Sequence, residues 1–198
     1  MNSKDKILEN IKMNKTSALY EQLAGHREAD SGLLNSDSKD AEPVNREKLL
    51  KIFCSNVEAA GAEVVELKPG DKISQFYPTA LDFTDEEVRK KFSPSTHLST
   101  LDKIECVVFE GAFGVAENGA VWLEDKDLPH RIIPFITQHL ILKLDAADFV
   151  LTMREAYSRI RLHETGFGVF ISGPSKTADI EQSLVYGAHG AVKVTVLC

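Results

Sequence analysis

The residues best suited to chemistry lie in the run 171–181, which reads Ile-Ser-Gly-Pro-Ser-Lys-Thr-Ala-Asp-Ile-Glu. Gly173 allows a ligand to approach the backbone closely, Ser175 and Thr177 carry hydroxyl groups, and Lys176 supplies a positive charge. Such a loop in front of a helix binds anions, because the first N–H groups of a helix have no partner within it. The run predicts a site for a carboxylate or a phosphate.

The same residues also fit a structural role. Ser175 and Thr177 are good caps for a helix that begins there, and Asp179 and Glu181 would be stabilised in its first turn by the helix dipole. The run resembles the end of a Walker A loop, but such a loop needs Gly at 170 and 175, where this chain has Phe170 and Ser175. We therefore reject nucleotide hydrolysis and keep both other interpretations.

Glu117 is a second candidate, because it lies between two apolar segments that read as strands. A carboxylate in apolar surroundings can have a raised pKa and act as acid, base or nucleophile. The alternative is a turn, since Asn118-Gly119 is a strong hairpin signal and Glu117 would simply lead into it. Both interpretations stay open.

His189 lies in the segment Gly187-Ala-His-Gly190, where it could face the same site as the 172–177 loop or bind a backbone carbonyl. No two histidines have the i, i+3 or i, i+4 spacing of helical ligands, so we expect no histidine metal site. The three cysteines, Cys54, Cys106 and Cys198, form no C-x-x-C pair. We therefore expect this chain to bind no cofactor.

Apolar periodicity predicts the elements that position these residues. Strands and helices alternate from residue 104 onward, which indicates an α/β fold with a mainly parallel sheet flanked by helices. The expected strands are 62–67, 104–109, 120–123, 138–144, 167–171 and 192–197, and the expected helices are 45–61, 84–92, 145–160 and 177–186. Ligands of such sheets bind at the carboxyl ends of the strands, where we expect the 172–177 loop and Glu117.

Composition bounds the class of protein. Residues 1–44 are expected to form an N-terminal helical arm and a flexible linker, and residues 45–198 one α/β domain. The formal net charge of −7 argues against nucleic-acid binding, which needs clustered Lys and Arg. Neither a membrane span nor a secretory signal is apparent, so we expect a cytoplasmic protein. A homo-oligomer stays an open alternative.

The run 172–181, followed by Leu184-Val-Tyr-Gly-Ala-His-Gly190, resembles the C-terminal signature of the lactate utilization protein C (LUD-domain) family. The segment Val115-Ala-Glu-Asn-Gly-Ala120 resembles the family's upstream Ala-Glu-Thr-Gly-Thr element. Asn118 and Ala120 replace the usual threonines, Lys176 stands where Arg is common, and Ala191 stands where Pro is usual. The resemblance covers roughly residues 100 to 198.

The resemblance implies a fold of the ribose-isomerase, glucosamine-deaminase and CoA-transferase group. It also implies a role in oxidising L-lactate to pyruvate beside iron–sulfur partner proteins that carry the clusters. Under this hypothesis the Gly173–Thr177 loop, Asp179 and His189 shape a pocket for a small carboxylate or for a partner's peptide.

Two other functions remain open. In related CoA-transferases a loop similar to Glu117-Asn-Gly119 carries a nucleophilic glutamate, so Glu117 could form a thioester with an acyl-CoA. Alternatively, the chain is a regulatory or scaffold module whose acidic linker, residues 25–43, becomes ordered on binding a partner.

Overall fold

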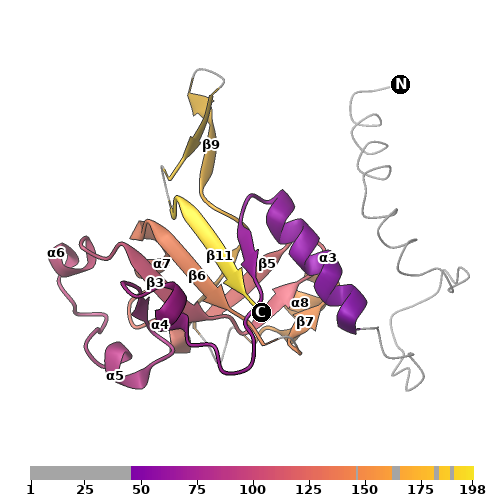
Figure 1. Cartoon of the computed structure of the whole chain (residues 1–198). Coiled ribbons are helices and arrows are strands. Elements are labelled where there is room, and N and C mark those ends of the chain that lie inside the picture. The colour runs from indigo at the N-terminus through magenta and orange to yellow at the C-terminus, as the bar shows by residue number, and fades with distance from the viewer. Residues whose placement is uncertain (1–45, 146, 162–165, 181–182, 188–189) are drawn as a thin grey trace, which may run out of the picture. The chain divides into compact units, whose positions relative to one another are not determined.

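The computed structural model describes residues 46–198 except 146, 162–165, 181–182 and 188–189 (Figure 1). By their contacts the residues divide into Met1–Pro43 and Val44–Cys198, and all described residues belong to the second unit. The arm and linker expected over residues 1–44 lie outside the described residues.

Short strands and helices alternate along this unit. The strands are β1 (Glu63–Val65), β2 (Leu81–Asp82), β3 (Cys106–Glu110), β4 (Phe113–Val115), β5 (Ala120–Glu124), β6 (His139–Lys143), β7 (Phe149–Val150), β8 (Gly168–Ile171), β9 (Lys176–Ile180), β10 (Ser183–Tyr186) and β11 (Lys193–Leu197). The helices are α3 (Arg46–Ala59), α4 (Ile73–Phe76), α5 (Glu86–Arg89), α6 (Leu98–Leu101), the 3-10 helix η1 (Asp125–Asp127), α7 (Ile133–Ile136) and α8 (Met153–Arg159). Among these, no helix is long and apolar enough to cross a membrane.

The strands form two main sheets and a hairpin. The larger sheet has the order β1-β11-β6-β3-β2, and all of its strand pairs are parallel. The smaller sheet has the order β7-β4-β5-β8, in which β5 runs antiparallel to both of its neighbours. Strands β9 and β10 pair with each other as a hairpin. The mainly parallel sheet flanked by helices confirms the predicted α/β class.

The largest core cluster joins the two sheets. Alternate residues of β3, such as Val107 and Phe109, share it with Val121 of β5, because side chains of a strand point alternately to its two faces. Helix α3 completes this core with an apolar stripe, and its Phe53 ring lies 4.7 Å from that of Phe149. Gly61, with φ +88°, follows the end of the helix, where a left-handed residue is common.

The outward faces of both sheets are also covered. On the parallel sheet, Val108 and Ile141 pack with Ile73 of α4. On the smaller sheet, Trp122 packs with Ala156 of α8. The unit therefore stacks helix, sheet, sheet and helix, which fixes where the carboxyl ends of the parallel strands emerge.

The helix predicted over 177–186 is wrong, because this segment forms β9 and β10. Ile180 and Leu184 have the i, i+4 spacing of a helix face, but Thr177, Val185 and Tyr186 are residues that favour strands. The backbone register pairs Val185 with Thr177 and Tyr186 with Lys176. Pairing with a neighbouring strand has overridden the short helical pattern.

The helix predicted over 145–160 is correct only in its second half. Phe149 and Val150 form β7, which pairs in parallel with β4, and α8 begins only at Met153. Its N-cap is Thr152, whose hydroxyl accepts a hydrogen bond from the Glu155 N–H, while Glu155 Oε2 accepts one from the Leu151 N–H at 2.9 Å. The spacing of Thr152 and Glu155 is a capping-box signal for this later start. The helix predicted over 84–92 is shorter in the structure: it is α5, whose N-cap is Asp85.

His139 gives the outer face of the parallel sheet a pH dependence. Its Nε2 lies 2.9 Å from Thr195 Oγ1, and its ring meets that of Tyr77 edge-on. Burial, assisted by the charge of Lys193, lowers the pKa of His139 below its ordinary value of 6.5, whereas Glu63 acts in the opposite sense.

The unfolded chain therefore binds a proton at His139 more readily than the folded chain. We expect the free energy of unfolding to fall as the pH drops through 6.5 toward the lower pKa of the folded state. Well above pH 6.5, the contribution of His139 to this free energy should not change with pH. Urea unfolding of the wild type and of His139→Gln between these limits measures the difference. An equally steep pH dependence in the variant would contradict the assignment to His139.

Candidate functional site

Glu117, Asn118 and Gly119 lie in the connection between β4 and β5. The Gly119 N–H donates to the Val115 carbonyl at 3.0 Å, and Asn118 Oδ1 accepts from the Ala120 N–H at 3.1 Å. Gly119 has φ +65°, a left-handed conformation that favours glycine. These residues thus form a hairpin turn, which was one of the two interpretations left open by the sequence.

This turn rests directly on the backbone of α3. Asn56 Nδ2 donates to the Ala116 carbonyl at 2.7 Å. A Cβ atom at Gly119 would lie only 2.5 Å from the backbone nitrogen of Val57. Gly119 is therefore needed both for its conformation and for close packing of the turn against the helix.

The Glu117 carboxylate holds the start of α8. Its Oε2 accepts a hydrogen bond of 2.7 Å from the Met153 N–H, which is the first residue of that helix. The Glu117 N–H donates to the Leu151 carbonyl at 2.9 Å. A carboxylate at a helix N-terminus satisfies a backbone donor that has no partner within the helix. The arrangement gives Glu117 a structural role.

The 172–176 loop meets the carboxyl end of α3. Gly173, with φ +73°, lies so close to Ala60 that a Cβ would be 2.4 Å from the Ala60 carbonyl oxygen. The Lys176 ammonium group donates to that same carbonyl. A positive charge at a helix C-terminus satisfies the unpaired carbonyls and the negative end of the dipole. Lys176 is thus engaged by the protein itself, and strand β9 follows in place of a helix N-terminus.

The position of this loop differs from the expectation. We predicted it at the carboxyl edge of the parallel sheet, but β8, which precedes it, belongs to the smaller sheet. The Ser175 N–H donates to the Ala191 carbonyl at 2.9 Å, just before β11 begins. The loop therefore lies near the amino end of a parallel strand, so that part of the prediction is wrong.

The structure brings the two predicted segments together. Ser172 Oγ donates to the Asn118 carbonyl at 2.9 Å, and both loops rest on the second half of α3. The backbones of Thr177 and Asp179 lie in β9, but their side chains are outside the described part of the chain. His189 also lies outside it, so its place beside the loop stays a prediction.

A pocket of about 360 Å³ opens elsewhere, at the carboxyl end of β3. This is the position where parallel sheets bind ligands. The connection from β3 to β4, the end of β5, the η1 helix and α8 all contribute to its wall. The lining residues are Glu110, Gly111, Ala112, Phe113, Glu124, Lys126, Asp127, Asp148 and Arg159.

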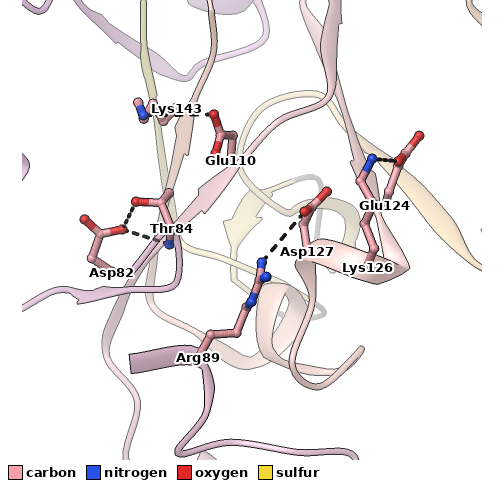
Figure 2. A network of polar contacts seen from close by, with 8 residues as sticks. All are labelled: Asp82, Thr84, Arg89, Glu110, Glu124, Lys126, Asp127 and Lys143. Carbon is pink, nitrogen blue, oxygen red and sulfur yellow. Dashed lines mark hydrogen bonds and ion pairs between the residues drawn. The ribbon is translucent and has the colours of Figure 1, made fainter. Parts of the chain in front are cut away.

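Ion pairs of unequal length surround the pocket, and Figure 2 draws those of Glu110, Glu124 and Asp127. Two are short: Lys126 Nζ lies 2.6 Å from Glu124 Oε2, and Arg159 Nη2 lies 2.7 Å from Asp148 Oδ1. Two are long. Lys143 Nζ of β6 lies 4.0 Å from Glu110 Oε1 of β3, and Arg89 Nη1 of α5 lies 3.8 Å from Asp127 Oδ1 of η1.

Asp127 has the most perturbed environment among these carboxyl groups. Burial raises its pKa above the ordinary aspartate value, and the negative charges of Glu124 and Glu110 act in the same direction. Lys126 and Arg89 oppose the shift without cancelling it. Asp127 therefore retains a proton to a higher pH than an exposed aspartate.

The sequence contains signals for this pocket. Glu110 directly follows the strand expected over 104–109, and the charged run Glu124-Asp-Lys-Asp127 follows the strand expected over 120–123. The rule that ligands bind at the carboxyl ends of strands points to these residues. Arg131 binds both oxygens of Asp125 at 2.7 Å.

Comparison with known proteins places the whole chain in one family, since the LUD domain model matches residues 5–198. The chain belongs to the LUD-domain family. The match extends well beyond the segment from residue 100 onward that carried the resemblance in sequence. The N-terminal residues from 5 onward are therefore part of the family pattern.

Curated relatives carry the name Lactate utilization protein C. The relative from Bacillus pumilus is 36% identical over 97 residues, which are 46% of this chain and 40% of the relative. The relative from Exiguobacterium sp. is 24% identical over 168 residues, which are 82% of this chain and 71% of the relative. In the first of these matches, the chain spans about two fifths of the relative's length.

A solved structure supports the fold of the LUD domain. The crystal structure of a DUF162 family protein from Deinococcus radiodurans superposes with a TM-score of 0.55 at 14% identity. The superposition covers 78% of this chain and 98% of the other. At this level of identity the comparison shows a shared fold.

Burial acts on all three cysteines of this LUD domain in the same direction. Burial raises the pKa of Cys54 and of Cys106, and it raises the pKa of Cys198 to about 12. Cys54 and Cys198 share a side-chain hydrogen bond. Among the described residues, no three His, Cys, Asp or Glu side chains gather in a way that could hold a metal ion.

Proposed function

We propose that this chain takes part in lactate utilization in the cytoplasm, as a subunit without clusters that works beside iron–sulfur proteins. The observation that carries the proposal is the LUD-domain match over residues 5–198, together with relatives named Lactate utilization protein C. In the proposed system, oxidation of L-lactate to pyruvate passes its electrons to clusters on the partner proteins.

The state of the cysteines supports this division of labour. Iron–sulfur clusters are bound by thiolates, so cluster ligands are cysteines whose pKa is low or whose environment favours the anion. Burial has the opposite effect at Cys54, Cys106 and Cys198, whose pKa values are raised. The three cysteines also form no C-x-x-C pair, so we assign the cluster ligands of the proposed system to the partner proteins.

Binding of a partner protein fits the contacts better than binding of a small carboxylate by the 172–177 loop. The Lys176 ammonium group already donates to the Ala60 carbonyl, and Gly173 packs against the same residue. That carbonyl takes one of the three N–H donors of the ammonium group, so a carboxylate would share Lys176 with the end of α3. The hairpin of β9 and β10, in contrast, projects from the body of the domain (Figure 1), and its strands pair only with each other among the described strands. Such edges can accept a further strand from a partner.

A CoA-transferase activity is less well supported by these contacts. The Glu117 carboxylate accepts the Met153 N–H, and Glu117 is not among the residues that line the pocket. A nucleophilic role would require this carboxylate to leave the start of α8. The lactate hypothesis requires no such rearrangement.

Growth of a deletion strain tests the proposed role. We expect loss of this chain to abolish growth on L-lactate, to leave growth on glucose unchanged, and to be reversed by the wild-type gene. A tagged full-length chain should also co-purify with proteins that contain iron and acid-labile sulfide when cells grow on L-lactate. Normal growth of the deletion strain on L-lactate, with no iron–sulfur protein in the purified material, would refute the proposal.

A further inference from the structure

Cys54 and Cys198 come from different elements and lie in the same layer of the core. Cys54 is in α3, directly after the fully buried Phe53. Cys198 follows β11, whose alternate residues Val194 and Val196 belong to the core cluster that α3 covers. Because side chains of a strand alternate between its two faces, Cys198 continues this face toward the helix. Both cysteines pack against the cluster and are only partly buried.

The two thiol groups are in contact, since Cys54 and Cys198 share a side-chain hydrogen bond. Backbone hydrogen bonds hold Cys198 in place. Its N–H donates to the Val65 carbonyl at 3.2 Å, and its carbonyl accepts from the Leu67 N–H at 3.0 Å. Thiols in contact need only small side-chain rotations to reach the sulfur–sulfur bond length of about 2.05 Å. The pair is therefore preorganised for a disulfide.

Cys106 provides a comparison within the same chain. It is also partly buried, but it lies at the start of β3 on the opposite face of the parallel sheet, in the cluster of Val108 and Ile141. The sheet therefore stands between Cys106 and the other two cysteines. Only Cys54 and Cys198 are placed to react with each other in the folded chain.

The surroundings of the pair favour thiols over thiolates. Burial raises the pKa of both groups, and the negative charge of Glu66 acts in the same direction. The hydrogen bond lowers the pKa of Cys54 and raises that of Cys198, so Cys54 ionises first and is the nucleophile of the pair. A nearby carboxylate also repels anionic oxidants. A small uncharged oxidant such as a hydroperoxide fits these surroundings best.

We propose that Cys54 and Cys198 are a redox-sensitive pair, which hydrogen peroxide converts into a reversible disulfide without participation of Cys106. The Cys54 thiolate attacks one peroxide oxygen, the oxygen–oxygen bond breaks, and the other oxygen leaves as water, so that Cys54 becomes a sulfenic acid. The Cys198 sulfur then attacks the Cys54 sulfur, the sulfur–oxygen bond breaks, and the hydroxyl group leaves as water with the Cys198 proton. Two thiols are oxidised to one disulfide, and one peroxide is reduced to two waters.

The disulfide would tie the end of β11 to α3. The turn at Gly119 rests on Val57, one helical turn after Cys54. The loop at Gly173 rests on Ala60, just beyond the end of the helix. Oxidation would therefore fix the helix against which both loops pack. Because the bond closes a long loop of the unfolded chain, we expect it to raise the melting temperature by roughly 5–10 °C.

Treatment of the reduced full-length chain with hydrogen peroxide tests the proposal. We expect two of the three thiols to be lost, and a peptide map to show Cys54 linked to Cys198. Dithiothreitol should restore both thiols. The rate should increase as the pH rises above neutrality, because the thiolate is the attacking species. Oxidation in urea should instead favour the shorter loop between Cys54 and Cys106, since the entropic cost of loop closure grows with loop length.

Serine variants separate the pair from general thiol oxidation. Cys106→Ser is the matched control, because it removes a partly buried thiol and should leave the disulfide and its effect on the melting temperature unchanged. Cys54→Ser and Cys198→Ser should form no linked peptide. In Cys198→Ser, dimedone should trap the sulfenic acid of Cys54, which has lost the thiol that resolves it. Circular dichroism of each variant shows whether it has folded.

The opposite results are equally clear. Intact thiols at Cys54 and Cys198, at a peroxide dose that oxidises free glutathione, would show that the pair does not react. A main product that links Cys106, or that joins two chains, would show that the fold does not direct the reaction. A lower melting temperature of the oxidised chain would show that the bond does not fit the native packing. The inference does not depend on the proposed role in lactate utilization, so failure of the growth test would leave it unaffected.

Discussion

Replacing Gly119 by alanine is expected to lower the free energy of unfolding by about 2–4 kcal/mol, the sum of backbone strain and overpacking. The strain arises because Gly119 has φ +65°, where an L-residue is disfavoured. The overpacking arises because the new Cβ would lie 2.5 Å from Val57 N and 2.7 Å from the carbonyl carbon of Asn56. Neither backbone can move without separating the turn from α3.

Gly70→Ala is the matched control, because Gly70 also has a positive φ, +98°, but a Cβ there has no atom within 4 Å. It should lose only the strain, about 1–2 kcal/mol. Urea unfolding of both variants gives the difference that belongs to the contact with α3. Equal losses in the two variants would mean that the turn does not press on the helix in solution.

Packing against α3 explains why two segments that are distant in sequence, around Gly119 and around Gly173, both carry family-like motifs. The turn at Gly119 presses on Val57, the loop at Gly173 presses on Ala60, and Ser172 joins the two loops. Close packing of backbones leaves no room for a side chain at either glycine. Much of the motif pattern in this chain therefore reflects how the smaller sheet is fixed to α3.

The strands of the parallel sheet could be predicted from the sequence, because β3 and β6 are buried on both faces and have apolar central runs, while β11, Lys-Val-Thr-Val-Leu, is rich in β-branched residues. Helix α3 could be predicted as well, since Phe53 and Val57 continue one apolar stripe up to Gly61. In these elements local preference and burial agree, so a single sequence is sufficient to find them.

The hairpin of β9 and β10 could not be predicted in this way. Its apolar residues Ile180 and Leu184 have helical spacing, and the residues between the two strands, Glu181-Gln182, lack the Asn-Gly or Asp-Gly signal of a tight turn. The site was misplaced for a related reason. A loop after a strand lies at the ligand edge only if that strand belongs to the parallel sheet, and strand pairing cannot be read from local pattern. The loop after β8 failed this condition, while Glu110 after β3 met it.

Substitution of Glu117 distinguishes its structural role from a catalytic one. Glu117→Ala removes the 2.7 Å acceptor of the Met153 N–H, and we expect it to lower the free energy of unfolding by about 1–3 kcal/mol. Glu117→Gln keeps an acceptor oxygen and loses only the charge at the start of α8, so its loss should be about 0.3–1 kcal/mol. Thermal or urea unfolding measures both.

A nucleophilic glutamate would give a different pattern from these two variants. The glutamine variant would then be as inactive as the alanine variant, because an amide cannot form the acyl anhydride and thioester that a carboxylate forms. If Glu117 has a structural role, growth of a complemented deletion strain on L-lactate should follow the stability of each variant. Glu117→Gln should then support growth, and Glu117→Ala should support it less well or only at lower temperature. A stable glutamine variant that fails to support growth would show that the carboxylate does chemistry. The preserved contact at α8 leads us to expect the first result, because the amide oxygen can take the same place against the Met153 N–H.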